Sequence, residues 1–313
     1  MADHPEIDSS VPHSARIWNY WLGGKDNYPV DQEVGDEFVR IFPQQVDIAR
    51  HSRAFLGRAV RHLAGETGMR QFLDIGTGLP TVDNTHEVAQ RVAPDTRIVY
   101  VDNDPLVLTH ARALLTSTPE GATSYLDADI REPDSILAKA AETLDFDRPV
   151  ALLLLGVLGH LTDKEDPEGV LARLVAPLAP GSHVVINDGT NVFGSPGADG
   201  VDDTARARAI ARYVEAGGVA YNLRSPERIT GFFDGMELLE PGVVPVSRWR
   251  PEPSPFGEPP EVDAFCGVAR IPQRPGFGGD STCADLTGRE RTAGVRKEGY
   301  PTKQLLERGF HGS

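Results

Sequence analysis

A chain of 313 residues, with 40% hydrophobic and 25% charged residues, has the composition of a globular protein that can bury a core. Its 46 acidic residues against 31 Lys and Arg give a formal net charge of −15, which repels nucleic-acid phosphates and anionic lipid surfaces. The longest apolar stretch, residues 150–159, is too short for a membrane span of about 20 residues. We therefore expect a small-molecule substrate, with no nucleic acid and no membrane as partner.

The cysteine content and the first residues bear on the cellular compartment. Cys266 and Cys283 form neither a metal-ligand pair nor a disulfide framework, which favours a reduced, cytoplasmic setting. The start, MADHPEIDSS, lacks the basic and apolar regions of a secretory signal. The sequence also shows no metal-ligand spacing, no P-loop and no G-x-S-x-G motif, so we expect no metal.

The first sixty residues have apolar side chains at helical spacing. Three helices are expected, at 14–22, 31–42 and 46–63. We interpret residues 1–60 as a helical cap on the rest of the protein.

From residue 61 onward, short apolar runs alternate with helical segments. Strands are expected at 71–75, 97–101, 123–126, 150–155 and 182–187. Helices are expected at 84–92, 105–115, 135–143 and 167–178. This alternation predicts an α/β fold with a mostly parallel sheet and helices on both faces.

The chain after the fifth strand is less regular. Its expected elements are a mobile lid at 189–201, helices at 202–216 and from Ser225, and a hairpin of 243–246 with 263–269. Asp202 or Asp203 is the expected cap of the first of these helices. We assign residues 61–270 to the sheet domain and expect the tail, 271–313, to be disordered.

The strongest functional signal is the segment FLDIGTGLP, in which a strand ends at Asp74 and feeds a turn with Gly76 and Gly78. Such a turn lies at the carboxyl end of the sheet, where ligands bind. A dinucleotide site requires a third glycine where this chain has Thr81. The carboxylate of Asp74 would repel a pyrophosphate and pair with an ammonium, which favours S-adenosylmethionine over NAD.

Acidic residues also follow the next two strands. Asp102 can accept hydrogen bonds from ribose hydroxyls, in NAD as well as in S-adenosylmethionine. Asp129 can accept one from an adenine amino group, and Ile130 can pack on the ring. Asp104 precedes a proline and is interpreted as a helix cap.

The chain resembles a family of bacterial S-adenosylmethionine-dependent methyltransferases that was long known only as a domain of unknown function. The resemblance covers residues 13–270 and rests on the segments SARIWNYWLGGKDNYPVD, RQFLDIGTGLPT, VYVDNDP, DADIREP and APGSHVVIND. It implies a class I, Rossmann-like methyltransferase with a mostly parallel seven-stranded sheet, a final antiparallel strand and an N-terminal helical extension.

By match of motif, the resemblance also implies cofactor-binding residues. It places Asp74, Gly76 and Gly78 at the methionine end, Asp102 and Asn103 at the ribose and adenine, and Asp129 and Ile130 at the adenine. The methyl acceptor is not implied. An NAD-dependent oxidoreductase and a non-catalytic S-adenosylmethionine-binding protein remain the alternatives.

The segment around the first glycine pair is rich in aromatic and polar residues. Tyr20, Lys25 and Tyr28 are candidates for a cap over the cofactor, and the alternative is aromatic packing of the extension on the sheet.

The strands at 150–155 and 182–187 are followed by candidate acceptor residues. His160 is a candidate general base, against the alternative of simple packing at a helix start. Asn187 and Asp188 are candidates for substrate contact. Arg224 and Arg228 are interpreted as surface charges on the helix that begins at Ser225, with an acidic acceptor as the alternative.

Overall fold

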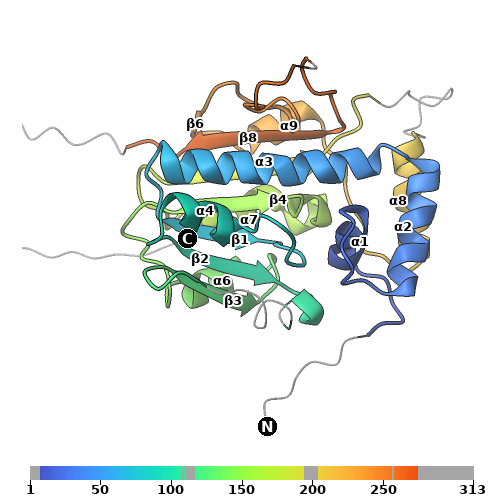
Figure 1. Ribbon diagram of the computed structural model, residues 1–313, viewed down its shortest axis with the longest axis horizontal. Coiled ribbons are helices and arrows are strands. Elements are labelled where there is room, and N and C mark those ends of the chain that lie inside the picture. The colour runs from blue at the N-terminus through green and yellow to red at the C-terminus, as the bar shows by residue number, and fades with distance from the viewer. Residues whose placement is uncertain (1–7, 108, 110–116, 194–203, 256, 274–313) are drawn as a thin grey trace, which may run out of the picture. The chain divides into compact units, whose positions relative to one another are not determined.

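The computed structural model describes residues 8–107, 109, 117–193, 204–255 and 257–273, all of which belong to one compact unit. A central sheet with helices on both faces organises this unit (Figure 1). Its parallel strands lie in the order β3-β2-β1-β4-β5. They are β1 (Gln71–Ile75), β2 (Arg97–Asp102), β3 (Ala122–Asp127), β4 (Ala151–Leu155) and β5 (His183–Gly189). The mostly parallel α/β sheet expected from the sequence is therefore confirmed.

The sheet ends in antiparallel strands. β8 (Ala264–Arg270) pairs along the whole of β5, and the two-residue strands β6 (Glu237–Leu238) and β7 (Val244–Pro245) pair with β8. The expected hairpin is present, with Val244 opposite Cys266. The path from β3 to β6 contains seven strands, and the short β7 adds an eighth beside β8.

Three N-terminal helices precede the sheet in the chain. They are α1 (Ser14–Trp21), α2 (Pro29–Ile41) and α3 (Gln45–Gly65). Figure 1 shows α3 and α4 (Thr85–Val92) over one face, while α1, α2 and α8 (Ala205–Glu215) lie beyond the carboxyl ends of the strands. The N-terminal extension therefore stands where a ligand of a parallel sheet would bind.

Successive residues of a strand point to opposite faces and so enter two separate cores. Phe72 packs with Phe55 and Leu63 of α3, whereas the next residue, Leu73, packs with Ile136 on the other face. The second face is covered by α6 (Pro133–Ala140), α7 (Pro167–Val175) and α9 (Pro226–Gly231).

Helix caps support some expectations and correct one. The helix expected from Ser225 is present as α9, and Ser225 caps it by accepting a hydrogen bond from the Arg228 amide. The cap of α8 is Thr204, whose hydroxyl accepts from the Ala207 amide at 3.2 Å, rather than Asp202 or Asp203.

Other expectations fall wholly or largely outside the described residues. These are the helix at 105–115, most of the lid at 189–201, and nearly all of the tail at 271–313.

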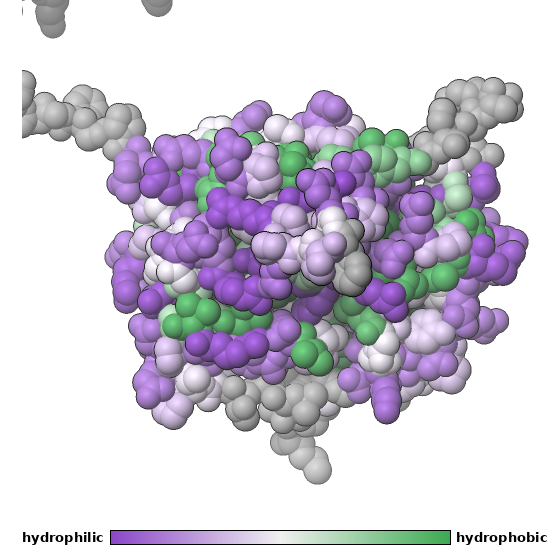
Figure 2. Space-filling view, turned by 45° about the horizontal axis from the view of Figure 1, so that its top comes forward, coloured by the Kyte–Doolittle hydropathy of each residue, from purple (hydrophilic) through white to green (hydrophobic). Residues whose placement is uncertain are grey.

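The surface in Figure 2 is mostly hydrophilic, and its hydrophobic residues form small, separate patches. Large apolar side chains that are exposed, such as Val82, Phe193 and Leu238, come from distant parts of the sequence. None of the helices described by the structure is both long and apolar enough to cross a membrane.

Candidate functional site

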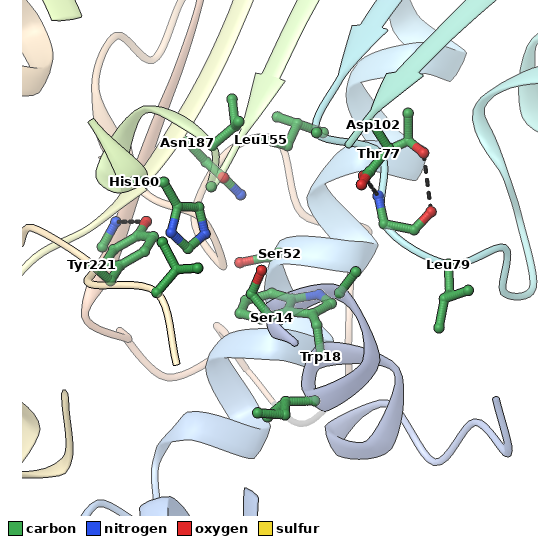
Figure 3. Close-up of a pocket in the computed structure, with 18 of the residues that line it drawn as sticks. Ser14, Trp18, Ser52, Thr77, Leu79, Asp102, Leu155, His160, Asn187 and Tyr221 are labelled. Atoms are coloured by element: carbon green, nitrogen blue, oxygen red, sulfur yellow. Dashed lines mark hydrogen bonds between the residues drawn. The ribbon is translucent and has the colours of Figure 1, made fainter. Parts of the chain in front are cut away.

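A pocket of about 270 Å³ opens at the carboxyl ends of the parallel strands. One end is lined by residues at or just after the carboxyl ends of β1, β2 and β3, and the other by residues at or just after the carboxyl ends of β4 and β5 (Figure 3). Part of the wall comes from α1, α2, α3 and α8. We call the first part the cofactor end, and the second part together with the apolar side chains of these helices the acceptor end.

The turn after β1 needs glycine for steric reasons. Gly76 has φ of +74°, and a Cβ there would lie 2.7 Å from Cγ2 of Val157. Gly78 has φ of +66° and donates its amide hydrogen to Oδ2 of Asp102 at 2.8 Å. The two glycines let the backbone turn sharply and tie the end of β1 to the end of β2.

Asp74 is a buried carboxylate at this turn, only 3% exposed. The Thr85 hydroxyl donates to its Oδ2 at 2.6 Å. Nearby, the Arg53 guanidinium donates to the Val82 carbonyl and to Asn84. Burial raises the pKa of Asp74 to about 6, against the lowering effects of Thr85 and Arg53. A cationic ligand group would therefore stabilise the charged form.

The residues after β2 and β3 complete the cofactor end. Asp102 is 8% exposed, and burial raises its pKa although the amides of Asp104 and Gly78 donate to it. The side-chain amide of Asn103 donates a hydrogen bond to Oδ2 of Asp129 at 3.2 Å. Ile130 is buried and lines the same pocket. The structure thus brings together the seven residues predicted from the sheet motifs: Asp74, Gly76, Gly78, Asp102, Asn103, Asp129 and Ile130.

The three residues predicted from the N-terminal segment are not among those that line the pocket. The Tyr20 hydroxyl donates to Oδ1 of Asp36 on α2 at 2.7 Å, and Lys25 is exposed. Tyr28 caps α2, and the Arg16 guanidinium stacks over its ring at 5.4 Å. In this structure the helical period turns Tyr20 toward α2, and a cap over the cofactor formed by Tyr20, Lys25 and Tyr28 stays a prediction.

The glycine pair after α1 serves a packed turn. Oδ1 of Asn19 accepts hydrogen bonds from the Asp26 amide at 3.1 Å and from the Asn27 side chain at 2.9 Å. A Cβ at Gly24 would lie 2.3 Å from the Asn19 side chain. The unusual composition of this segment is explained by its own packing.

The opposite face of α1 does reach the pocket. Ser14, Ile17, Trp18 and Trp21 line it, and Figure 3 shows Ser14 and Trp18 beside Ser52 of α3. These four residues are not among the predicted site residues, although the apolar stripe of the predicted helix contains three of them.

His160 stands at the acceptor end. It closes the 3-10 helix Leu158–His160, which follows β4. Its Nδ1 lies 3.2 Å from the Ala220 carbonyl oxygen, and its ring meets the Tyr221 ring edge-on at 5.1 Å. Burial is the main cause that lowers its pKa. A neutral imidazole that donates from Nδ1 carries its lone pair on Nε2.

Asn187 and Asp188 end β5, and both line the pocket. The Tyr221 hydroxyl donates to Oδ1 of Asp188, and Nη1 of Arg224 donates to Oδ2 at 2.9 Å. Arg224 and Asp188 are both buried, so the prediction of Arg224 as a surface charge is wrong. Arg228 is a surface charge as predicted, paired with Glu168 and Asp163. The overlooked feature of Arg224 is its place directly before the cap residue Ser225. At that position its side chain faces the sheet.

The fold and the site together define a class of protein. A parallel sheet extended by antiparallel strands, with a glycine turn after β1 and acids after three successive strands, is the arrangement of class I S-adenosylmethionine-dependent methyltransferases. The comparison with known families agrees: residues 1–272 match the family described as S-adenosyl methyltransferase, and the chain belongs to it.

Solved structures of similar sequence support this assignment. A DUF574 family protein from Streptomyces avermitilis MA-4680 is 42% identical, with a TM-score of 0.79, and the match covers 85% of this chain and 100% of that one. A candidate methyltransferase from Thermobifida fusca YX is 40% identical, with a TM-score of 0.75, and the match covers 86% and 98%. None of the curated proteins matches the chain.

The cofactor of this family is S-adenosylmethionine, and the residues present fit it. The buried Asp74 carboxylate suits the ammonium of the methionine moiety. The Asp102 carboxylate, which already accepts from the Gly78 and Asp104 amides, has lone pairs left that would suit ribose hydroxyls. The buried Ile130 side chain would suit an adenine ring.

Proposed function

We propose that this chain is an active methyltransferase that moves a methyl group from S-adenosylmethionine to a small-molecule acceptor. The observation that carries the proposal is the continuity of one pocket from Asp74 and Asp102 to His160 and Asn187. A protein that only bound the cofactor would not need an acceptor compartment joined to it.

The cofactor end is proposed to position the sulfonium. Asp74 would hold the ammonium, with Gly76 and Gly78 giving the methionine part room at the turn. Asp102 and Asn103 would hold the ribose and adenine, and the pair after β3, Asp129 and Ile130, would hold the adenine. When bound, S-adenosylmethionine supplies an activated methyl group, so the protein has mainly to align the acceptor and exclude water.

His160 is proposed as the general base for an acceptor that begins protonated. The Ala220 carbonyl fixes the proton on Nδ1, and the lowered pKa keeps the ring neutral near pH 7. Asn187 is proposed to contact the acceptor. Asp188 already accepts from Tyr221 and Arg224, so its role is to position Tyr221 against His160.

The cellular setting is part of the proposal. The formal charge of −15 disfavours a nucleic-acid acceptor. We also propose a bacterial source and a cytoplasmic location. The low cysteine content favours the cytoplasmic location.

Two measurements test the proposal. Calorimetric titration with S-adenosylhomocysteine and with NAD should show binding of the first alone, and binding of NAD alone would contradict the assignment. Release of S-adenosylhomocysteine is then measured across small hydroxyl and amine acceptors. A protein that binds the cofactor product but releases none with any acceptor would be a non-catalytic binder.

A further inference from the structure

The acceptor end of the pocket has an aromatic and aliphatic wall. It is formed by Trp18, Trp21, Phe38, Ile48, Ile210 and Tyr213. The rings of Trp18 and Trp21 meet edge-on at 5.9 Å, and those of Trp21 and Phe38 lie 5.2 Å apart. Such a wall favours a ligand with a flat apolar body.

The charged residues at this end already have partners. Asp188 accepts from Arg224 and Tyr221. Nη1 of Arg206 donates to the Thr190 carbonyl at 2.7 Å and to the Asp263 carbonyl, and the buried Asp263 carboxylate nearby balances its charge. An anionic or cationic acceptor would therefore lose its hydration without gaining a counter-charge from these groups. The acceptor compartment is matched to an uncharged molecule.

A polar group in the wall adds a constraint. Gln45 is 3% exposed, lines the pocket, and its Oε1 has no hydrogen-bond partner among the described residues. A buried acceptor atom of this kind is satisfied by a hydroxyl or amide hydrogen of a ligand. His160 as base takes the hydrogen of the reacting hydroxyl, so a second donor on the acceptor would be needed to satisfy Gln45.

The size of the pocket limits the acceptor. One water requires about 10–15 Å³ of cavity volume, so a cavity of about 270 Å³ holds about 20 waters. This accommodates the cofactor and a compact acceptor. Aliphatic amines of that size are cations at neutral pH.

We propose, resting on the proposed function above, that the acceptor is a compact, uncharged aromatic hydroxyl compound that lies against Trp18 and presents its hydroxyl to Nε2 of His160. In the transfer, the acceptor oxygen forms a bond to the methyl carbon as the bond from that carbon to sulfur breaks. The bonding pair stays on sulfur, giving neutral S-adenosylhomocysteine, and the hydroxyl proton passes to His160.

The test uses three bicyclic probes of similar size that differ in charge. The protein saturated with S-adenosylhomocysteine is titrated with 2-naphthol, naphthalene-2-sulfonate and 2-naphthylmethylamine. We expect 2-naphthol to bind at least about tenfold more tightly than either ion. With S-adenosylmethionine present, mass spectrometry should detect 2-methoxynaphthalene with one S-adenosylhomocysteine per product.

A pair of variants on α8 provides the control. Ile210 lines the pocket, whereas Val214 is 42% exposed. Ile210→Ala should weaken 2-naphthol binding about three- to tenfold and leave S-adenosylhomocysteine binding unchanged. Val214→Ala should change neither affinity.

The outcomes separate the two proposals. No binding of S-adenosylhomocysteine contradicts the proposed function and this inference with it. Normal binding of S-adenosylhomocysteine, with an ion bound as tightly as 2-naphthol, overturns the acceptor class alone. Binding of 2-naphthol without methylation overturns the hydroxyl step.

Discussion

The two ends of the pocket are built in different ways. At the cofactor end, Asp74 and Asp102 lie at the carboxyl ends of β1 and β2, and Asp129 follows β3, so hydrogen bonding among these neighbouring parallel strands brings the three acids together. At the acceptor end, the wall comes from four helices and from the loop that carries Tyr221. A local strand-and-turn pattern can therefore encode the first end, whereas the second depends on how distant helices pack.

The largest expected effect concerns the base at the acceptor end. His160→Asn keeps an amide that can donate to the Ala220 carbonyl but removes Nε2. We expect the methylation rate of a hydroxyl acceptor to fall about 100- to 10,000-fold, with unchanged affinity for S-adenosylhomocysteine. Because burial lowers the pKa of His160, the wild-type rate should hold at pH 7 and fall only in more acidic solution. An unaltered rate would remove His160 from the chemistry.

The next effect is on stability at the same end. Arg224→Leu leaves the Asp188 carboxylate buried without its cation, which should lower the free energy of unfolding by about 3–5 kcal/mol. Arg228→Leu is the matched control, because its ion pairs are exposed and contribute about 0–1 kcal/mol. Urea denaturation of both variants measures the difference. Equal losses would contradict a buried ion pair.

At the cofactor end, Asp74→Asn removes the charge proposed to hold the ammonium. Calorimetry should show an affinity for S-adenosylhomocysteine that is about 10- to 100-fold weaker. The control is Asp83→Asn, which removes an exposed carboxylate from the loop after β1. Asp83 pairs with Arg91 of α4, and its loss should not change the affinity. If both variants bind normally, Asp74 does not contact the ligand.

The pKa of Asp74 adds a signature in pH. Because the folded value is raised to about 6, the carboxyl of the free protein is protonated below that pH. Affinity for the ammonium should therefore decline as the pH falls below about 6. A raised folded pKa also stabilises the fold in acid, and this contribution is lost as the pH rises through about 6. Asp74→Asn should consequently raise the melting temperature of the ligand-free protein at pH 8, and a lowered one would contradict the raised pKa.

The smallest effect tests the predicted cofactor cap in the N-terminal extension. Tyr20→Phe and Lys25→Ala should leave the affinity for S-adenosylhomocysteine within about twofold of the wild type, because neither side chain lines the pocket. Titration calorimetry of each variant measures this. A large loss in either would mean that the segment moves onto the cofactor when it binds.

Two side-chain orientations could not be predicted from the sequence, for a common reason. Tyr20 and Trp18 stand on the same short helix, and the helical period alone cannot say which of the two faces the sheet. Arg224 is a charged residue directly before a helix cap, which is typical of a surface position. Its guanidinium nevertheless pairs with Asp188 in the interior. In both cases the deciding contact comes from another element, the next helix for Tyr20 and strand β5 for Arg224.

The sequence by itself determined the alternation of strands and helices, the glycine turn after β1 and the order of the acids that follow the strands. These features depend on local periodicity and backbone conformation, which neighbouring residues largely set. Only the tertiary structure decided which face of α1 closes the pocket, that Arg224 is buried against Asp188, and that Tyr221 supports His160. Those contacts join segments that meet only when the helices pack on the sheet. A local sequence pattern therefore cannot predict them.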